Sequence, residues 1–390
     1  MKFAKRTQML DSTFMDEILK AAAIPNLISF AGGLPNPELF PVEEIKAATD
    51  TVLTNDGTNA LQYNITEGYG LLREYIADRY YPGTDINADN ILITNGSQQA
   101  LDIIARLLVD PGDSIMFERP GYLGAIQAFH MAQPQYLQVP ITSEGVDVAV
   151  ATKMLADNPD VRFFYGVPNF QNPTGGSYSI ETRKTLSKEL ERTDSLYIED
   201  NPYGEIRFDG EQPPAMMDYL GFQVISLGSF SKVLAPAMRI GWMCASHEII
   251  KAAIGIKGAT DMHTNYLTQR ILFQYLADND FDAHIAQTVA VYRAKRDLML
   301  GELEKALPDD VHFVRSEGGM FTWLTLPKDI KSMDLLQMVK ERGLYYIPGI
   351  PFYVGTPDEH TLRLNFSNSS DENIVKGIGI LGRAIADFRA

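Results

Sequence analysis

The stretch "LGSFSKVLAPAMRIGW", residues 227–242, places a lysine between serines and an apolar run. Lys232 follows Ser229 and Ser231, and Arg239 stands seven residues further along the chain. Burying a charged amine without a partner is costly, so a lysine in these surroundings needs a chemical reason. The segments that precede it in the chain suggest what that reason is.

Apolar runs of strand length alternate with segments of helical periodicity. The expected strands are "ILIT" (91–94), "VRFFYGV" (161–167), "SLYI" (195–198) and "VISLG" (224–228), and the expected helices are "QQALDIIARLL" (98–108) and "ETRKTLSKELER" (181–192). This alternation is typical of an α/β fold with a mostly parallel sheet and helices on both faces. Such sheets bind ligands at the carboxyl ends of their strands.

The pattern changes after about residue 285. A long helix is expected over 286–307, followed by strands over 318–327 and 361–367. The expected division is a large α/β domain, residues 46–285, and a smaller α+β domain, residues 1–45 and 286–390.

Composition excludes several classes of partner. The 390 residues are 45% hydrophobic and carry a net charge of -16, which argues against nucleic acid and anionic membrane. Cys244 is the only cysteine, which fits a reducing cytoplasm, and the six histidines lack metal-ligand spacing. The first 20 residues lack the apolar segment of a signal peptide. We therefore expect a cytoplasmic protein with no metal, no membrane and no nucleic-acid partner.

The segment "GIGILG" (377–382) matches the glycine pattern of dinucleotide-binding proteins. No strand is expected before it, and no acidic residue stands about 20 residues beyond it, as that site requires. We therefore do not expect a nucleotide here.

Polar side chains follow each expected strand of the large sheet. The first strand leads to Gly96, Ser97 and Gln98, where the free N–H groups of a helix start suit a phosphate, although Ser97 could equally be an N-cap. The next strands lead to Asn172 in "PNFQNPTGG", to Glu199, Asp200 and Tyr203 in "EDNPYGEI", and to Lys232 in "SFSK". Read singly, the asparagine could be a turn residue and the aspartate a cap. Together, these loops would bring five groups to one edge of the sheet, namely an anion-binding helix start, an amide, a carboxylate, a phenol and an amine.

Taken in order, these motifs resemble the fold-type I pyridoxal-phosphate (PLP) enzymes, and within them the class I and II aminotransferases. The segments most similar to the 2-aminoadipate/kynurenine aminotransferase branch are "LISFAGGLPNPELFP", "LQYNITEGYGLLRE", "VPNFQNPTGG", "IEDNPYGEIRF" and "GSFSKVLAPAMRIGW". The likeness extends over essentially the whole chain. It implies PLP as cofactor and a large domain with a mostly parallel, seven-stranded sheet flanked by helices.

The resemblance also implies roles for single residues. Lys232 would be the Schiff-base lysine and, once freed, the general base at the substrate Cα. Asp200 would keep the pyridine nitrogen protonated, so that the ring acts as an electron sink. Asn172 and Tyr203 would bind the phenolic oxygen of the ring, and Tyr122 would stack on its face. The phosphate would be bound by Ser97, Gln98, Ser229, Ser231, Arg239 and, from a neighbouring subunit, Tyr63.

Substrate binding is expected at a strand of the smaller domain. Arg363 alternates with apolar residues in "TLRLNFS", so a rigid strand displays it, and read alone it would be a solvated charge. The resemblance instead makes it the residue that binds the substrate α-carboxylate, beside Asn172 and the backbone of Gly33. The position of Tyr63 implies a homodimer with shared active sites.

The expected reaction is ping-pong transamination. An L-amino acid leaves its nitrogen on the cofactor, and a 2-oxo acid, in this family 2-oxoglutarate, removes it. One alternative is other PLP chemistry on an amino acid, by a carbon–sulfur β-lyase or a racemase. Another is the effector-binding half of a transcription regulator, which the acidic charge and the lack of room for a helix-turn-helix before "ISFAGGLP" disfavour.

The stretch "STFMDEIL" (12–19) carries a difference from this branch. Asp16 stands where the branch commonly has an arginine that reaches the distal carboxylate of 2-aminoadipate. A carboxylate there would repel that group, or it would face water in an acidic first helical turn. In either case the arginine is missing, so we expect neutral aromatic or aliphatic donors to be used better than 2-aminoadipate.

Overall fold

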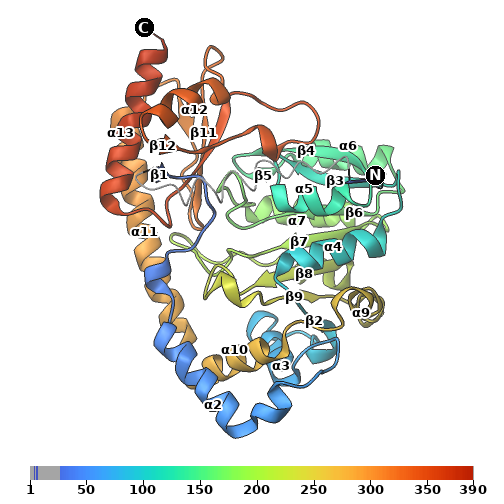
Figure 1. Ribbon diagram of the computed structural model, residues 1–390. Helices are drawn as coiled ribbons and strands as arrows, with labels where there is room; N and C mark the ends of the chain where they lie inside the picture. The colour runs from blue at the N-terminus through green and yellow to red at the C-terminus, as the bar shows by residue number, and fades with distance from the viewer. Residues whose placement is uncertain (1–3, 5, 8–26, 390) are drawn as a thin grey trace.

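The computed structural model describes residues 4, 6, 7 and 27–389, and two sheets with their helices dominate it (Figure 1). The larger sheet contains, in spatial order, β2 (Ile91–Thr94), β9 (Gly241–Cys244), β8 (Val224–Ser229), β7 (Leu196–Asp200), β6 (Phe163–Gly166), β3 (Ser114–Arg119), β4 (Gln135–Thr142) and β5 (Gly145–Val146). The pairings from β8 through to β4 are parallel, and those at the two ends are antiparallel. The expected mostly parallel sheet is confirmed, and β5 adds a two-residue eighth strand.

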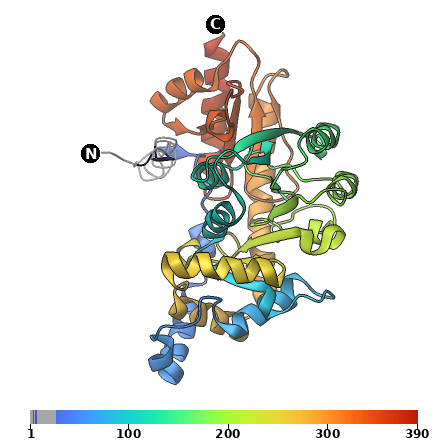
Figure 2. The ribbon, with the colours of Figure 1, turned by 90° about the vertical axis from the view of Figure 1, so that its right-hand side faces the viewer.

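Helices cover both faces of this sheet. The helices of this part of the chain are α2 (Val42–Ala60), α3 (Gly70–Tyr80), α4 (Ser97–Leu108), α5 (Leu123–His130), α6 (Val148–Asp157), α7 (Ile180–Leu190), α8 (Met216–Leu220), α9 (His247–Asp261) and α10 (Tyr266–Asp278). Among them, α2 packs against α10 and not on the sheet. Figure 2 shows α4 and α5 on one side of the strands and α6 to α8 on the other. Because both faces are covered, β7 and β8 are almost fully buried, and β7 is apolar up to Ile198 before it ends in Glu199 and Asp200.

The smaller sheet is antiparallel. It contains β10 (His312–Phe313), β11 (Phe321–Thr325), β14 (Thr361–Asn365) and β13 (Ile347–Pro348), and β1 (Ile28–Ser29) pairs separately with β12 (Leu344–Tyr345). Its helices are α11 (Phe281–Ala306), α12 (Ser332–Glu341) and α13 (Asp371–Phe388). Among residues 27–389 no helix combines the length and the hydropathy needed to cross a bilayer.

Two helices extend across the expected domain boundaries. The boundary at residues 45 and 46 falls inside α2, and the boundary at residues 285 and 286 falls inside α11. Figure 1 shows α11 running along one side of the molecule from the small sheet toward α2 and α10. The division into two domains stays a prediction.

The glycines of "GIGILG" lie in the middle of α13 and serve helix packing. A Cβ at Gly382 would approach the carbonyl oxygen of Ala306 to 2.6 Å, and one at Gly377 would approach the ring of Phe30 to 2.5 Å. These glycines therefore let α13 pack closely against α11 and the chain next to β1.

The register of the parallel strands sets where the polar residues emerge. Asp200, the last residue of β7, pairs with Leu227 of β8, and Gly166, the last residue of β6, pairs with Glu199. The strands therefore end close to the same level of the sheet. The loops that follow them meet above one edge.

Candidate active site

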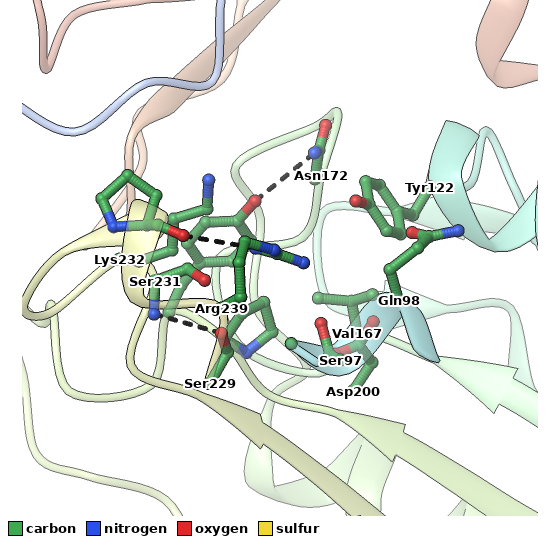
Figure 3. Close-up of a pocket in the computed structure, with 14 residues that line it drawn as sticks. Ser97, Gln98, Tyr122, Val167, Asn172, Asp200, Ser229, Ser231, Lys232 and Arg239 are labelled. Atoms are coloured by element: carbon green, nitrogen blue, oxygen red, sulfur yellow. Dashed lines mark hydrogen bonds between the residues drawn. The ribbon is translucent and has the colours of Figure 1, made fainter. Parts of the chain in front are cut away.

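A pocket with about 610 Å³ of empty space opens at the carboxyl edge of the large sheet (Figure 3). Its wall includes Ser97, Gln98, Tyr122, Asn172, Asp200, Tyr203, Ser229, Ser231, Lys232 and Arg239. Figure 3 shows Lys232 and the two serines on one side, Tyr122 and Gln98 on the other, and Asp200 at the base. The structure thus brings together these predicted residues from separate loops of the sheet.

Lys232 lies at the wall of the pocket with its amine held by backbone. Its Nζ donates a hydrogen bond of 2.8 Å to the carbonyl oxygen of Gly33, which places Gly33 at the site as well. Burial, and then the positive charges of Arg363 and Arg239, lower the pKa of Lys232 to about 8. A substantial fraction of the amine is therefore neutral near pH 7.5, and a neutral amine can act as a nucleophile or a base.

Asp200 is neither a turn residue nor a helix cap. It ends β7 with 1% of its surface exposed, and its Oδ2 accepts a hydrogen bond of 2.8 Å from the Tyr165 hydroxyl. Its Oδ1 is buried and has no partner among the described residues. Burial raises the pKa of Asp200 to about 6. Because buried polar atoms are nearly always hydrogen-bonded, Oδ1 is expected to take a donor from a ligand.

The start of α4 and Arg239 form the anion-binding side of the pocket. Gly96, with φ of 71°, is the N-cap and Ser97 is the first helical residue, so Ser97 is not the cap. Arg239 follows a short helix, η5 (Pro236–Met238), in the left-handed region, and its Nη2 donates to the carbonyl oxygen of Asn95 at 2.9 Å. A guanidinium beside free helical N–H groups suits a phosphate.

Arg363 reaches the pocket residues from the small sheet. Its Nη1 donates to Asn172 Oδ1 at 2.7 Å, and Asn172 Nδ2 donates to the Tyr203 hydroxyl at 3.4 Å. Its Nη2 donates to the carbonyl oxygen of Ala31 at 2.6 Å, and its Cζ lies over the Phe321 ring, 4.2 Å from the ring centroid. All five residues of β14 are buried, so Arg363 is not a solvated charge and the expected alternation in exposure is absent.

Arg363 is held charged in spite of this burial. Burial lowers its pKa to about 10, which still leaves the guanidinium positive at neutral pH. Its Nε is buried and has no partner among the described residues. An unfilled donor on a charged guanidinium is suited to a carboxylate ligand.

Glu118 is a buried carboxylate near this pocket that the sequence analysis did not predict. Glu118 accepts hydrogen bonds from Gln171 Nε2 at 2.9 Å, from the Tyr178 hydroxyl at 2.5 Å and from the Val167 amide at 2.9 Å. These groups belong to the segment that carries Asn172, so Glu118 fixes its course. Burial raises the pKa of Glu118 to about 7. Glu118 ends the run "SIMFE", and an acidic residue directly after three apolar ones is the sequence feature that could have indicated it.

One predicted residue, Tyr63, lies on the surface of the protein. Tyr63 is 74% exposed, and its ring meets His263 edge-on with 5.9 Å between the ring centroids. It does not line the pocket of its own chain. Asp16 lies outside the described residues, so its expected effect on substrate choice stays a prediction.

Residues 27–381 match the family model described as aminotransferase class I and II. The chain belongs to this family. It is 38% identical over 395 residues to aromatic-amino-acid aminotransferase 1 of Thermococcus litoralis, covering 99% of this chain and 94% of that one. It is 37% identical over 395 residues to the 2-aminoadipate transaminase of Thermus thermophilus, covering 100% and 97%.

A solved structure shares the fold over nearly its whole length. It is LysN, the alpha-aminoadipate aminotransferase of Thermus thermophilus complexed with N-(5'-phosphopyridoxyl)-L-leucine, with a TM-score of 0.93 and 36% identity over 99% of this chain and 98% of that one. The protein is thus a PLP-dependent aminotransferase of fold type I. The expected family, fold and general reaction are confirmed.

The pocket of this aminotransferase fits PLP on its own chemistry. The unpartnered Asp200 Oδ1 suits a protonated ring nitrogen, and the Lys232 amine suits an aldehyde. Gly96 gives the backbone room for a phosphate, because a Cβ there would lie 2.5 Å from Arg239 Nη2. The site therefore offers one matching group to each reactive end of the cofactor.

This geometry predicts the effect of a methyl group at Gly96. Gly96→Ala should weaken PLP binding to the apoenzyme at least tenfold, about 1.4 kcal/mol, because the Cβ displaces Arg239 and strains the positive φ. Gly83→Ala is the matched control, since Gly83 also has positive φ, 75°, but open space around its Cβ position. Fluorescence titration with PLP measures both affinities, and circular dichroism checks the fold. Equal affinities in the two variants would contradict this assignment.

Proposed function

We propose that this aminotransferase transfers the amino group of a neutral L-amino acid to 2-oxoglutarate in ping-pong half-reactions. The observation that carries the proposal is the meeting, in one pocket, of a lysine with a lowered pKa and a buried aspartate with a free oxygen. Arg363 contacts Asn172, and its Nε has no partner among the described residues. This Nε suits the α-carboxylate, which the amino-acid donor and the 2-oxo acid acceptor have in common.

The residues would hold the cofactor at three points. The phosphate would lie at the start of α4, against the N–H groups of Ser97 and Gln98 and the guanidinium of Arg239. Ser229 and Ser231 would add hydroxyl groups there. The ring nitrogen would face Asp200, the phenolic oxygen would face Asn172 and Tyr203, and Tyr122 would cover one ring face. When bound, PLP supplies an electron-poor ring that stabilises negative charge on the substrate Cα.

Lys232 would carry the proton transfers. Its Nζ, held by the carbonyl oxygen of Gly33, can take a proton from the substrate Cα and later return one, because its pKa of about 8 lies near the working pH. Arg363 would hold the α-carboxylate and so fix the orientation of the Cα bonds. Its own position depends on Asn172, which accepts a hydrogen bond from Nη1.

Neutral donors are proposed on the basis of Asp16. An aspartate supplies no positive charge for a distal carboxylate, and like charges in a partly desolvated site repel. The aminotransferase family supports transfer over β-elimination or racemisation, which use the same cofactor. A lyase would release pyruvate and ammonia without an acceptor, so incubation of a donor with the enzyme in the absence of 2-oxoglutarate distinguishes it from a transaminase.

We also propose a cytoplasmic homodimer in which Tyr63 reaches the phosphate of the partner subunit. Tyr63 lies in a group of exposed apolar side chains that includes Leu61, Ile65 and Met262. Exposed apolar groups of this kind favour association, and a second copy would cover them. Each active site would then contain residues of two chains.

Lys232 gives the first test of this function. Borohydride treatment of the PLP-loaded enzyme should place the cofactor on Lys232, and peptide mass spectrometry locates it. The rate of PLP incorporation into apoenzyme should rise with pH with its midpoint near 8 and level off well above that pH, because half of the amine is neutral at its pKa and the rest loses its proton only at higher pH. Lys232→Ala should lower kcat by roughly 10² to 10⁴.

Lys257 is the matched control for this labelling. It is also buried, but its Nζ contacts both carboxylate oxygens of Asp261 at 2.9 Å. It should remain unlabelled. Label on Lys257 or any other lysine in place of Lys232 would refute the assignment.

A donor panel tests the proposed substrates. With 2-oxoglutarate as acceptor, kcat/KM for phenylalanine or leucine should exceed that for 2-aminoadipate, and Asp16→Arg should raise the value for 2-aminoadipate relative to leucine. Asp16→Asn separates loss of the negative charge from gain of a positive one. A parent enzyme that prefers 2-aminoadipate to every neutral donor would show that Asp16 does not set this choice.

Mixed dimers test the sharing of active sites. When a Tyr63→Phe chain pairs with a Lys232→Ala chain, one site carries both changes and the other neither, if Tyr63 acts across the interface. Such dimers should retain about half of the parent activity, since one of their two sites is intact. If Tyr63 acts within its own chain, no intact site remains and activity falls to the level of the single variants.

A further inference from the structure

Tyr165 faces Asp200 from the neighbouring strand. In the parallel pair of β6 and β7, Tyr165 pairs with Ile198, and side chains alternate along a strand, so Tyr165, Ile198 and Asp200 share one face of the sheet. The Tyr165 hydroxyl donates to Asp200 Oδ2 at 2.8 Å. Both side chains are buried, at 0% and 1% exposure, so no water competes for this bond.

The ring of Tyr165 is fixed by its neighbours. It stacks on Phe117 with 5.1 Å between centroids and an interplanar angle of 12°, and it meets Phe129 edge-on at 5.5 Å. Burial and the nearby carboxylates hold the pKa of Tyr165 well above its usual value, so the hydroxyl keeps its proton and acts as a donor. A rigid donor in a water-free site gives Asp200 a fixed orientation.

We propose that Tyr165 is a positioning residue that holds Asp200 ionised through Oδ2 and leaves Oδ1 free for the cofactor nitrogen. This rests on the proposed function, in which that nitrogen faces Asp200. One proton is available to the carboxylate and the ring nitrogen together. A hydrogen bond to the carboxylate favours the arrangement in which the nitrogen holds the proton.

Among the described residues, Tyr165 is the group whose hydrogen bond counters the effect of burial on the pKa of Asp200. Burial raises the pKa of the carboxyl, and the hydrogen bond from Tyr165 acts in the opposite direction. The other titratable groups that face Asp200 are Tyr122, Tyr203 and Glu118, and Lys232 and Arg239 share its pocket. Neither cation makes a hydrogen bond to Asp200 in the described part of the chain. Removing the hydroxyl should therefore raise the pKa of Asp200 above its present value of about 6.

Tyr165→Phe removes the hydroxyl and keeps the stacked ring. In apoenzyme carrying carboxyl-labelled aspartate, the Asp200 signal, assigned with Asp200→Asn, should titrate at least one pH unit higher than in the parent, which is a tenfold change in proton affinity. The dissociation constant of PLP at pH 7 should rise tenfold or more. The loss in PLP affinity should shrink as the pH is raised, because hydroxide restores the carboxylate.

Tyr197→Phe is the matched control. Tyr197 is also fully buried in the sheet, but it lies three residues before Asp200 on β7, so its side chain projects from the opposite face. Tyr197→Phe should change the proton affinity of Asp200 and the dissociation constant of PLP less than twofold. If Tyr165→Phe changes these two quantities and Tyr197→Phe does not, a general effect of removing a buried hydroxyl is excluded.

The outcomes separate this proposal from the proposed function. If Tyr165→Phe leaves the Asp200 titration and the PLP affinity unchanged while Asp200→Ala still loses PLP, the positioning role is overturned and the function stands. If Asp200→Ala keeps the parent affinity, the cofactor nitrogen does not face Asp200, and the proposal falls with that assignment. A shift in titration together with a loss of PLP affinity that high pH reverses supports both.

Discussion

The active site depends on the desolvation of charged groups at the edge of a parallel sheet. Asp200, Lys232 and Arg363 all lose water in this pocket, and an isolated charge in such a place is expensive. The structure offsets the cost with hydrogen bonds from backbone and side chains, but it leaves Asp200 Oδ1 and Arg363 Nε unfilled. Those atoms define where a bound molecule must supply a donor and an acceptor.

A second layer of polar groups keeps the first in place. Glu118 holds the segment that carries Asn172, and Tyr165 holds Asp200. Hydrogen bonds to charged groups are worth about 1.5–3 kcal/mol each, and their loss leaves a buried charge without a partner. The orientation of Asn172 and Asp200 is therefore set by residues that do not line the pocket themselves.

Much of this site could be predicted from sequence because it lies where apolar strands end. The runs before Asn172, Asp200 and Lys232 are short and hydrophobic, so the change to polar residues marks the strand end sharply. The supporting layer could not be predicted in this way. Tyr165 lies inside such a run and reads as core, and only the strand register shows that it faces Asp200.

The burial of Arg363 was also beyond the sequence pattern. Alternation along β14 predicts one exposed face, but all five residues are buried, and Arg363 contacts Asn172 and the backbone of Ala31 from other parts of the chain. The polar residue in that alternation, Arg363, is therefore buried for a reason that lies elsewhere in the chain. Local periodicity reports which residues share a face, and it does not report what covers that face.

The hydrogen bond between Asn172 and Arg363 joins residues 191 positions apart in the chain. At 5–20 residues per second, a ribosome would make Arg363 roughly 10 to 40 s after Asn172. The last strand of the large sheet, β9, ends at Cys244, so in the later part of that interval all strands of the sheet have been made, yet the amide that contacts the arginine has no partner. A nascent chain would therefore carry most of the groups proposed to bind cofactor before the group proposed to hold the substrate carboxylate has been synthesised.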